Sequence, residues 1–221
     1  MEYLVSDIIK AAKVALDENV SSKALADLQD VDTLKLDEII LSKVEDAARL
    51  VVTEAPRELL DSGTPLGVAV IERDGLPDGV CRVAVPDDYL RLLVLQTSDW
   101  RTPAIEAITE DDPRYLLQSS PCAGIRGNAD RPIVALVHTA DGSQALELHT
   151  TGIDSTVKRG VYVPRPTIDE SDRITLPVKL YRATVYRVAA LTALAVLSAD
   201  QATALMGISR QLSGINNEPV Q

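Results

Sequence analysis

Apolar positions in the first third of the chain recur at the spacing of an α-helix. The first set is Leu4, Val5, Ile8, Ile9, Ala12 and Leu16. After a polar interval, the pattern predicts a short helical segment around Ala24–Leu28 and a longer helix over Leu36–Ala55. The longer helix should end before Pro56, because proline disfavours a helical conformation in the residue that precedes it. Each predicted helix has an apolar stripe and therefore needs a partner that buries it.

The pattern changes between about Gly63 and Pro164, where short apolar runs alternate with glycine, proline and aspartate. Such punctuation is typical of strands and turns. The predicted strands are Gly67–Glu72, Val80–Val85, Tyr89–Thr97, Pro132–His138, Gln144–His149 and Val161–Val163. Asp141-Gly142 favours a tight hairpin turn between two of them. A helical turn or two is expected within Pro103–Gln118, followed by a loop.

The last quarter of the chain is predicted to be helical again. Pro177 precedes Val178–Leu197, a segment that is apolar nearly all round and should therefore be packed on several sides. Ser198 and Gln201 match a capping box that opens a final helix from Ala199 to about Leu212. A loose tail is expected over Gly214–Gln221.

This order predicts an α+β fold in which the N- and C-terminal helices form a helical core around a β-rich inserted segment. The expected regions are residues 1–62, which are helical, residues 63–165, which are β-rich, and residues 166–221, which complete the helical core. A chain of 221 residues can bury such a core as one domain with an inserted layer. Because phenylalanine is absent and aromatic residues make up 3%, the core should be aliphatic.

Charge and hydropathy exclude two classes of function. The formal net charge of -11 argues against sequence-independent binding to DNA, which depends on lysine and arginine neutralising phosphates. This negative charge would suit a surface along which DNA passes without binding, or it would serve only to keep the protein soluble. The most apolar segment, Val178–Leu197, carries Lys179, Arg182 and Arg187, so no membrane span is expected. The N-terminus has no secretory signal pattern, and the protein is expected to be made and kept in a cytoplasm.

Candidate chemistry is sparse. His138 and His149 fall in the two arms of the predicted hairpin, where they would form either an incomplete metal pair or ordinary surface positions. Cys81 and Cys122 lack C-x-x-C spacing. The sequence contains no nucleophile elbow and no glycine-rich phosphate loop followed by lysine. Two carboxylate pairs, Asp111-Asp112 and Asp169-Glu170, lack the alternating ligands of a calcium loop. No catalytic, cofactor-binding or metal-binding residue is therefore predicted, and the chain is not expected to be an enzyme.

Two motifs carry a resemblance. Val85-Pro86-Asp87-Asp88-Tyr89-Leu90-Arg91-Leu92 begins a predicted strand, and Leu176-Pro177 leads into an alanine-rich helix. In this order they resemble the head-to-tail connector (adaptor) proteins of tailed bacteriophages. Ser98-Asp99-Trp100, the spacing of Pro113, Tyr115 and Gln118, and Arg131-Pro132-Ile133-Val134 are further similar to neck proteins of phages and prophages of gut Bacteroidota. The order of features covers most of the chain, from about Leu36 to Leu197.

The resemblance implies a helical core with a β-rich insertion and a ring, commonly of twelve subunits, in the neck of the virion. Such a ring docks beneath the portal protein, extends the channel through which genome DNA passes without specific binding, and offers a platform to downstream neck or tail proteins. Aromatic side chains that would be either core residues or interface anchors are Tyr89, Trp100, Tyr115, Tyr181 and Tyr186. The ends, Met1–Asn19 and Gly214–Gln221, are expected to become ordered only on assembly.

Two alternatives remain open at the level of sequence. One is another virion role, such as a tail-completion or head-completion protein. The other is a cytoplasmic enzyme of unrecognised type, which would need a deep polar pocket that gathers His138 or His149 with carboxylates.

Overall fold

The computed structural model describes residues 1–19, 36–61, 63–67, 71–122, 124–196 and 199–215. The chain forms two compact units. Met1–Ser62 and Pro166–Gln221 make up the first, here called the helical unit, and Gly63–Arg165 make up the second, here called the β unit. Helices and sheets are both present, so the mixed α+β class predicted from the sequence is confirmed.

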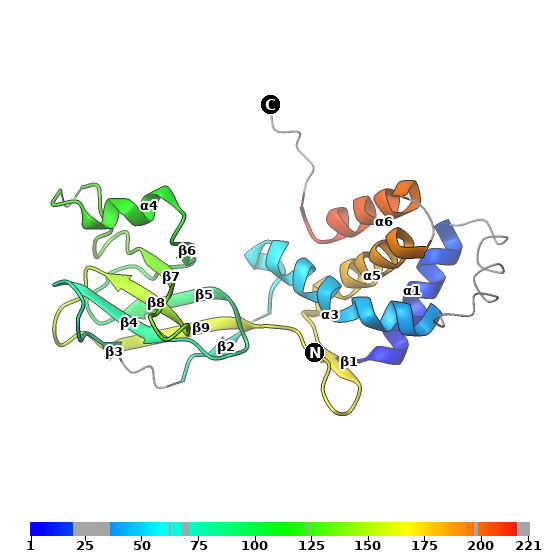
Figure 1. Ribbon diagram of the computed structural model, residues 1–221, viewed down its shortest axis with the longest axis horizontal. Coiled ribbons are helices and arrows are strands. Elements are labelled where there is room, and N and C mark those ends of the chain that lie inside the picture. Colours follow the sequence, from blue (N-terminus) through cyan, green and yellow to red (C-terminus); the bar gives the residue numbers. More distant parts are fainter. Residues whose placement is uncertain (20–35, 62, 68–70, 123, 197–198, 216–221) are drawn as a thin grey trace. The chain divides into compact units, whose positions relative to one another are not determined.

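The helical unit is arranged around one central helix. Its elements are β1 (Glu2–Leu4), α1 (Val5–Asn19), α3 (Leu36–Glu54), η1 (Arg57–Leu59), β10 (Arg173–Thr175), η3 (Val178–Leu180), α5 (Tyr181–Val196) and α6 (Ala199–Leu212). Helix α5 contacts α1, α3 and α6 (Figure 1). Its buried residues lie on all sides, as expected from the nearly uniform apolar character of the segment. The core of this unit is aliphatic and includes Ile8, Leu16, Ile40 and Leu205.

The N-terminal segment is part of this core. Strand β1 pairs with β10 in antiparallel register, with Tyr3 opposite Ile174. Val5, Ile8 and Ala12 of α1 are buried in the same cluster as α5. The expectation that Met1–Asn19 becomes ordered only on assembly is therefore wrong, because α1 buries its apolar stripe within the single chain.

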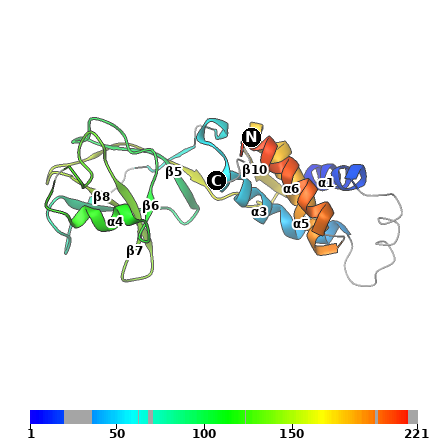
Figure 2. The same cartoon turned by 90° about the horizontal axis from the view of Figure 1, so that it is seen from above.

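The β unit consists of two sheets and a short helical segment. Its elements are β2 (Thr64–Pro65), β3 (Ile71–Glu72), β4 (Val80–Ala84), β5 (Tyr89–Thr97), β6 (Ile108–Thr109), α4 (Pro113–Leu116), η2 (Leu117–Ser119), β7 (Val134–His138), β8 (Gln144–His149) and β9 (Val157–Pro164). The strand orders are β2-β9-β5 and β3-β4-β8-β7-β6, and only the β6–β7 pair among these described strands is parallel. One apolar cluster joins both sheets, and α4 lies next to β6 (Figure 2).

The turn that opens β5 has a structural role. The amide of Tyr89 donates to the carbonyl oxygen of Pro86 at 2.9 Å, which closes the turn expected from Pro86-Asp87-Asp88. The Tyr89 ring stacks on Tyr162 of β9, with ring centroids 5.9 Å apart. The Tyr162 hydroxyl donates in turn to Asp88 Oδ1 at 2.9 Å, and burial together with this bond raises the pKa of Tyr162 to about 12. The motif therefore fastens the start of β5 to the end of β9.

Most predicted elements are present, with differences in length. β5, β8 and α6 have the predicted bounds, whereas β9 begins earlier, at Val157. The β7–β8 connection runs over Thr139–Ser143 and is longer than the tight turn expected, with Gly142 in the left-handed region (φ 86°). Pro177 precedes η3, and α5 itself begins at Tyr181. The predicted segment Ala24–Leu28 and the capping residue Ser198 lie outside the described residues.

Candidate functional site

The best-defined polar cluster of the β unit surrounds Glu147. Its carboxylate is buried, and Oε2 accepts from Arg82 Nε at 3.0 Å and Nη2 at 2.8 Å. The other oxygen, Oε1, accepts from the Tyr115 hydroxyl at 3.1 Å. Arg82 and Glu147 are direct partners in the β4–β8 register, so their side chains leave the sheet on the same face. The cluster ties α4, which carries Tyr115, to the sheet.

His149 lies beside this cluster. Its Nε2 is 3.5 Å from Glu147 Oε1, and its ring meets the Tyr115 ring edge-on at a centroid distance of 6.1 Å. Burial lowers the pKa of His149, and the nearby Glu147 carboxylate opposes this effect only in part. The imidazole is therefore neutral at neutral pH.

Acid should destabilise the β unit through His149. The folded-state pKa lies below the ordinary value of 6.5, so the unfolded state binds a proton first and stability falls as pH drops below that value. Denaturant unfolding followed by Trp100 fluorescence at several pH values measures this loss. We expect His149→Gln to flatten the dependence below about pH 6.5, and His138→Gln, at an exposed position of the same unit, is the control for replacing a histidine. If the free energy of unfolding of His149→Gln depends on pH as it does in the wild type, His149 does not cause the loss of stability in acid.

A cavity of about 280 Å³ adjoins His149. Its lining includes the exposed, oppositely charged side chains of Asp78 and Arg126 and the backbone around Thr150. Thr150 has a φ of 61°, which is unfavourable for a β-branched residue, and its hydroxyl donates to the carbonyl oxygen of Gly127 at 2.6 Å. The carbonyl oxygen of Thr150 accepts from Trp100 Nε1 at 3.2 Å, so the strained residue is held on two sides.

The chemistry available at this cavity is limited. His149 lies 3.5 Å from the Glu147 carboxylate, but that carboxylate already accepts hydrogen bonds from Arg82 and Tyr115. The Cys81 thiol is buried, and burial raises its pKa, which keeps it protonated and a poor nucleophile. The hydroxyl of Thr151 contacts the Cys81 sulfur at 3.4 Å. The ion pair of Arg82 with Glu147 and the Tyr115 hydrogen bond beside the cavity stabilise the fold.

Of the two interpretations of the histidines, the metal pair is not supported, because the structure does not bring them together. His138 is paired with Gln144 beside the β7–β8 loop, whereas His149 is paired with Val80 at the other end of the hairpin. The arms of a hairpin bring residues together only when they are opposite in register, and these two are not. Within the described parts of the chain, no three histidine, cysteine or carboxylate side chains come together as a metal site would require.

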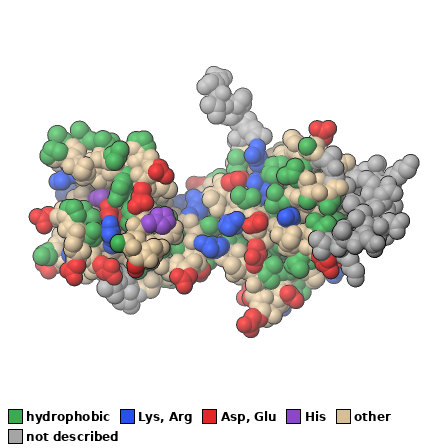
Figure 3. All heavy atoms as spheres, in the orientation of Figure 1, with side chains coloured by type: hydrophobic (Ala, Val, Ile, Leu, Met, Phe, Trp, Pro, Cys, Tyr) green, Lys and Arg blue, Asp and Glu red, His purple; other side chains and the backbone are tan. Residues whose placement is uncertain are grey.

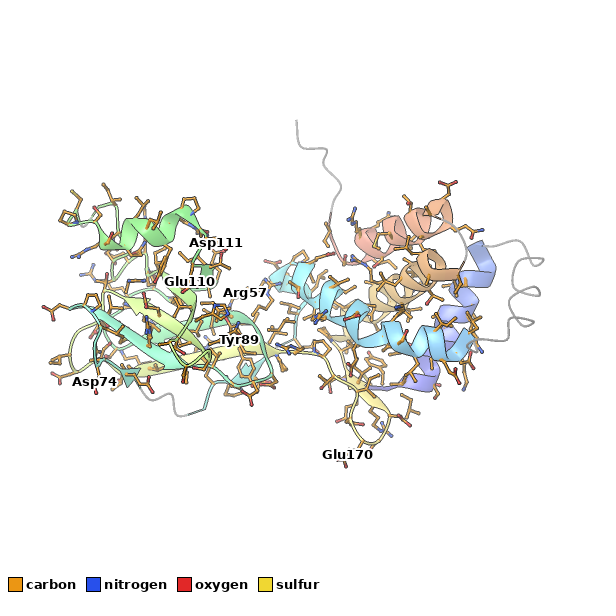
Figure 4. All side chains as sticks on the ribbon, in the orientation of Figure 1. Arg57, Asp74, Tyr89, Glu110, Asp111 and Glu170 are labelled. Atoms are coloured by element: carbon orange, nitrogen blue, oxygen red, sulfur yellow. The ribbon has the colours of Figure 1, made fainter. Side chains whose placement is uncertain are left out.

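The two carboxylate pairs are engaged in local turns. Asp112 is the N-cap of α4 and accepts from the amide of Arg114 at 2.8 Å. Asp169 accepts from the amides of Ser171 and Arg173 in the loop that carries Glu170 (Figure 4). Both interactions satisfy backbone donors, as the interpretation as ordinary turns predicts.

The five aromatic candidates divide into two groups. Tyr89 and Trp100 are buried in the core of the β unit, which leaves them almost no surface for a partner. Tyr115, Tyr181 and Tyr186 are partly exposed, although Tyr115 is bonded to Glu147 and Tyr181 stacks on Tyr3 at 4.4 Å. An interface role stays a prediction for these three tyrosines. Tyr89 and Trp100 are too buried to support such a role.

Sequence reasoning missed an apolar surface on the β unit. Leu116, Leu117 and Ile125 are 75%, 45% and 54% exposed, and we call them the α4 cap. Hydrophobic side chains gather over α4 in the space-filling view (Figure 3). The only signal in the sequence was the pair of adjacent leucines. Because only a helical turn was expected there, nothing indicated that their side chains lie on the surface.

Sequence reasoning also missed an ion pair in the helical unit, in which the arginine is buried and the carboxylate is partly exposed. Arg187 of α5 is buried, and its Nη2 donates to Glu54 Oε2 of α3 at 2.7 Å. Its Nε donates to the hydroxyl of Ser209 in α6 at 3.3 Å, and that hydroxyl donates to the carbonyl oxygen of Ala183 at 2.8 Å. Three helices are thus connected by one guanidinium group.

Comparisons with known proteins add no relative. No protein-family model matches the chain, and no curated protein matches it in sequence. Among the described helices, none combines the length and the apolar character that a membrane crossing requires.

Proposed function

We propose that the chain is a structural virion protein, a head-to-tail connector that forms a ring beneath the portal protein of a tailed phage. The observation that carries the proposal is the order of the two units along the chain. The β unit is one continuous segment, Gly63–Arg165, between two segments that pack together as the helical unit. A helical core with a β-rich insertion is the architecture that the resemblance implies.

The sequence motifs of the resemblance have structural roles that support the proposal. Tyr89 and Asp88 of the strand-opening motif fasten β5 to β9 through Tyr162. Leu176 is buried and leads into the central helix of the helical unit. In a ring, the helical unit would supply the wall, and the β unit would supply a platform for the next neck or tail protein. The net charge of -11 suits a channel through which DNA slides without binding.

Assembly tests the proposal. We expect the purified chain to form rings, either alone or when it is mixed with the portal protein of the same genome, because ring closure needs two different faces on each subunit. Mass photometry gives the number of subunits, and negative-stain electron microscopy shows whether the particles are closed.

Two outcomes would contradict the connector role. A chain that stays monomeric and does not co-purify with portal protein is not a connector. A chain that binds only tail or capsid proteins is instead a completion protein. The position of the gene relative to those for portal and capsid provides an independent check.

A further inference from the structure

We propose that the α4 cap binds a second copy of the chain, at the start of α5 in the helical unit of the neighbouring subunit. This inference rests on the connector function proposed above and names one contact of its ring. The cap consists of three well-exposed aliphatic side chains in one short segment, Leu116, Leu117 and Ile125. Apolar side chains that gather on a surface, in contrast to isolated ones, are typical of interaction sites.

The cap is held in place by the polar cluster beneath it. Tyr115, which precedes the two leucines, bonds to the buried Glu147. Gln118, which follows them, donates to the carbonyl oxygen of Arg114 at 2.7 Å and accepts from the amide of Gly127 at 2.8 Å. The second of these bonds joins the helical segment to the loop that carries Ile125. Such preorganisation lowers the entropy lost when a partner binds.

The segment that leads into the cap is acidic, whereas the exposed Arg126 next to Ile125 is basic. The segment from Glu106 to Arg114 contains four carboxylates, Glu106, Glu110, Asp111 and Asp112, and one arginine. Arg114 pairs with Glu106 and Asp112. Glu110 and Asp111 lie where β6 leads into α4, and Asp111 is exposed (Figure 4). A partner that fits this surface should place cations around an apolar side chain, because complementary charge selects the partner and its orientation.

The helical unit offers a surface of that kind at the start of α5. Val178 is 56% exposed and is flanked by Lys179 and Arg182, which are also exposed. The Lys179 ammonium donates to the carbonyl oxygen of Glu58, a neutral acceptor, at 3.0 Å. The cap and this surface are different parts of one chain, so a contact between them is heterologous, which is the type of contact from which a ring is built when the rotation between subunits closes.

Substitutions in the full-length chain test the contact. Leu116→Asp should weaken ring assembly by about tenfold or more in mass photometry, as expected for a central apolar residue of an interface. Ile153→Asp is the matched control, because Ile153 is 85% exposed in the same unit but lies outside the cap. It should assemble as the wild type does. Trp100 fluorescence verifies that both variants are folded.

Charge reversal tests the partner surface independently of Leu116. Asp111→Lys and Arg182→Glu should each weaken assembly, and the double variant should recover it. If single and double variants all form rings as the wild type does, the cap is not an interface between copies, whereas the connector function stands. If the single variants fail and the double variant shows no recovery, the start of α5 is the wrong partner surface. A wild type that forms no ring even with portal protein overturns both proposals.

Discussion

Glu147→Ala is expected to lower the free energy of unfolding of the β unit by about 3 kcal/mol. The substitution leaves Arg82 and the Tyr115 hydroxyl without their shared acceptor in a largely buried position. The cost should lie at the lower end of the range for broken buried pairs, because Arg82 keeps some contact with water. Denaturant unfolding followed by tryptophan fluorescence measures it selectively, since the chain has one tryptophan, Trp100, in the core of the β unit.

Two control variants make this prediction specific. Glu147→Gln keeps acceptor oxygen for Tyr115 but removes the charge that faces Arg82, so a smaller loss is expected. Asp74→Ala removes an exposed carboxylate from the β3–β4 turn of the same unit and should be close to neutral (Figure 4). If Glu147→Ala is as stable as Asp74→Ala, the cluster does not hold α4 against the sheet.

Glu54→Ala is expected to destabilise the helical unit by about 2 kcal/mol, because it removes the carboxylate partner of a buried guanidinium although that carboxylate is itself partly exposed. Its loss leaves the buried Arg187 guanidinium with a hydroxyl acceptor and no carboxylate. Circular dichroism at the helical minimum should show the loss, because most helical residues lie in this unit. Arg187 and its partners in α3 and α6 all lie in the helical unit, whereas Trp100 lies in the β unit. The unfolding transition followed by Trp100 fluorescence should therefore stay unchanged, and it serves as the internal reference.

Replacing both partners separates charge burial from packing. The double variant Glu54→Leu with Arg187→Met should recover most of the stability, because apolar groups of similar volume often replace a buried ion pair without net cost. Arg210→Ala, which removes an exposed arginine from the neighbouring helix α6, should change little. A double variant as unstable as Glu54→Ala would mean that packing rather than charge burial determines the cost.

The elements that the sequence predicts well are those whose periodicity is long. α3, α5 and α6 each carry several turns of apolar spacing, and β5 combines a proline-led turn with a long apolar run. β1, β2, β6 and β10 are short pairings of two or three residues, set by partners distant in the chain. Their formation depends on tertiary contacts that leave no local pattern.

The candidate site was less predictable for the same reason. Glu147 and Arg82 are separated by 65 positions and meet only because β4 and β8 pair in one particular register. Arg187 looked like a reason to exclude a membrane span, and its partly exposed partner Glu54 lies 133 positions away. A single sequence does not reveal the register of two paired strands or the faces by which two helices pack. It therefore cannot show which residues lie opposite each other.

The pairing of β2 with β9 brings together the two points at which the chain enters and leaves the β unit. Thr64 lies opposite Tyr162, and the unit ends at Arg165. A segment whose ends are neighbours can be lengthened, shortened or exchanged while the rest of the chain spans the same short gap. The β unit can therefore be replaced or altered as a whole, and surface segments such as the α4 cap can diversify while the helical unit stays unchanged.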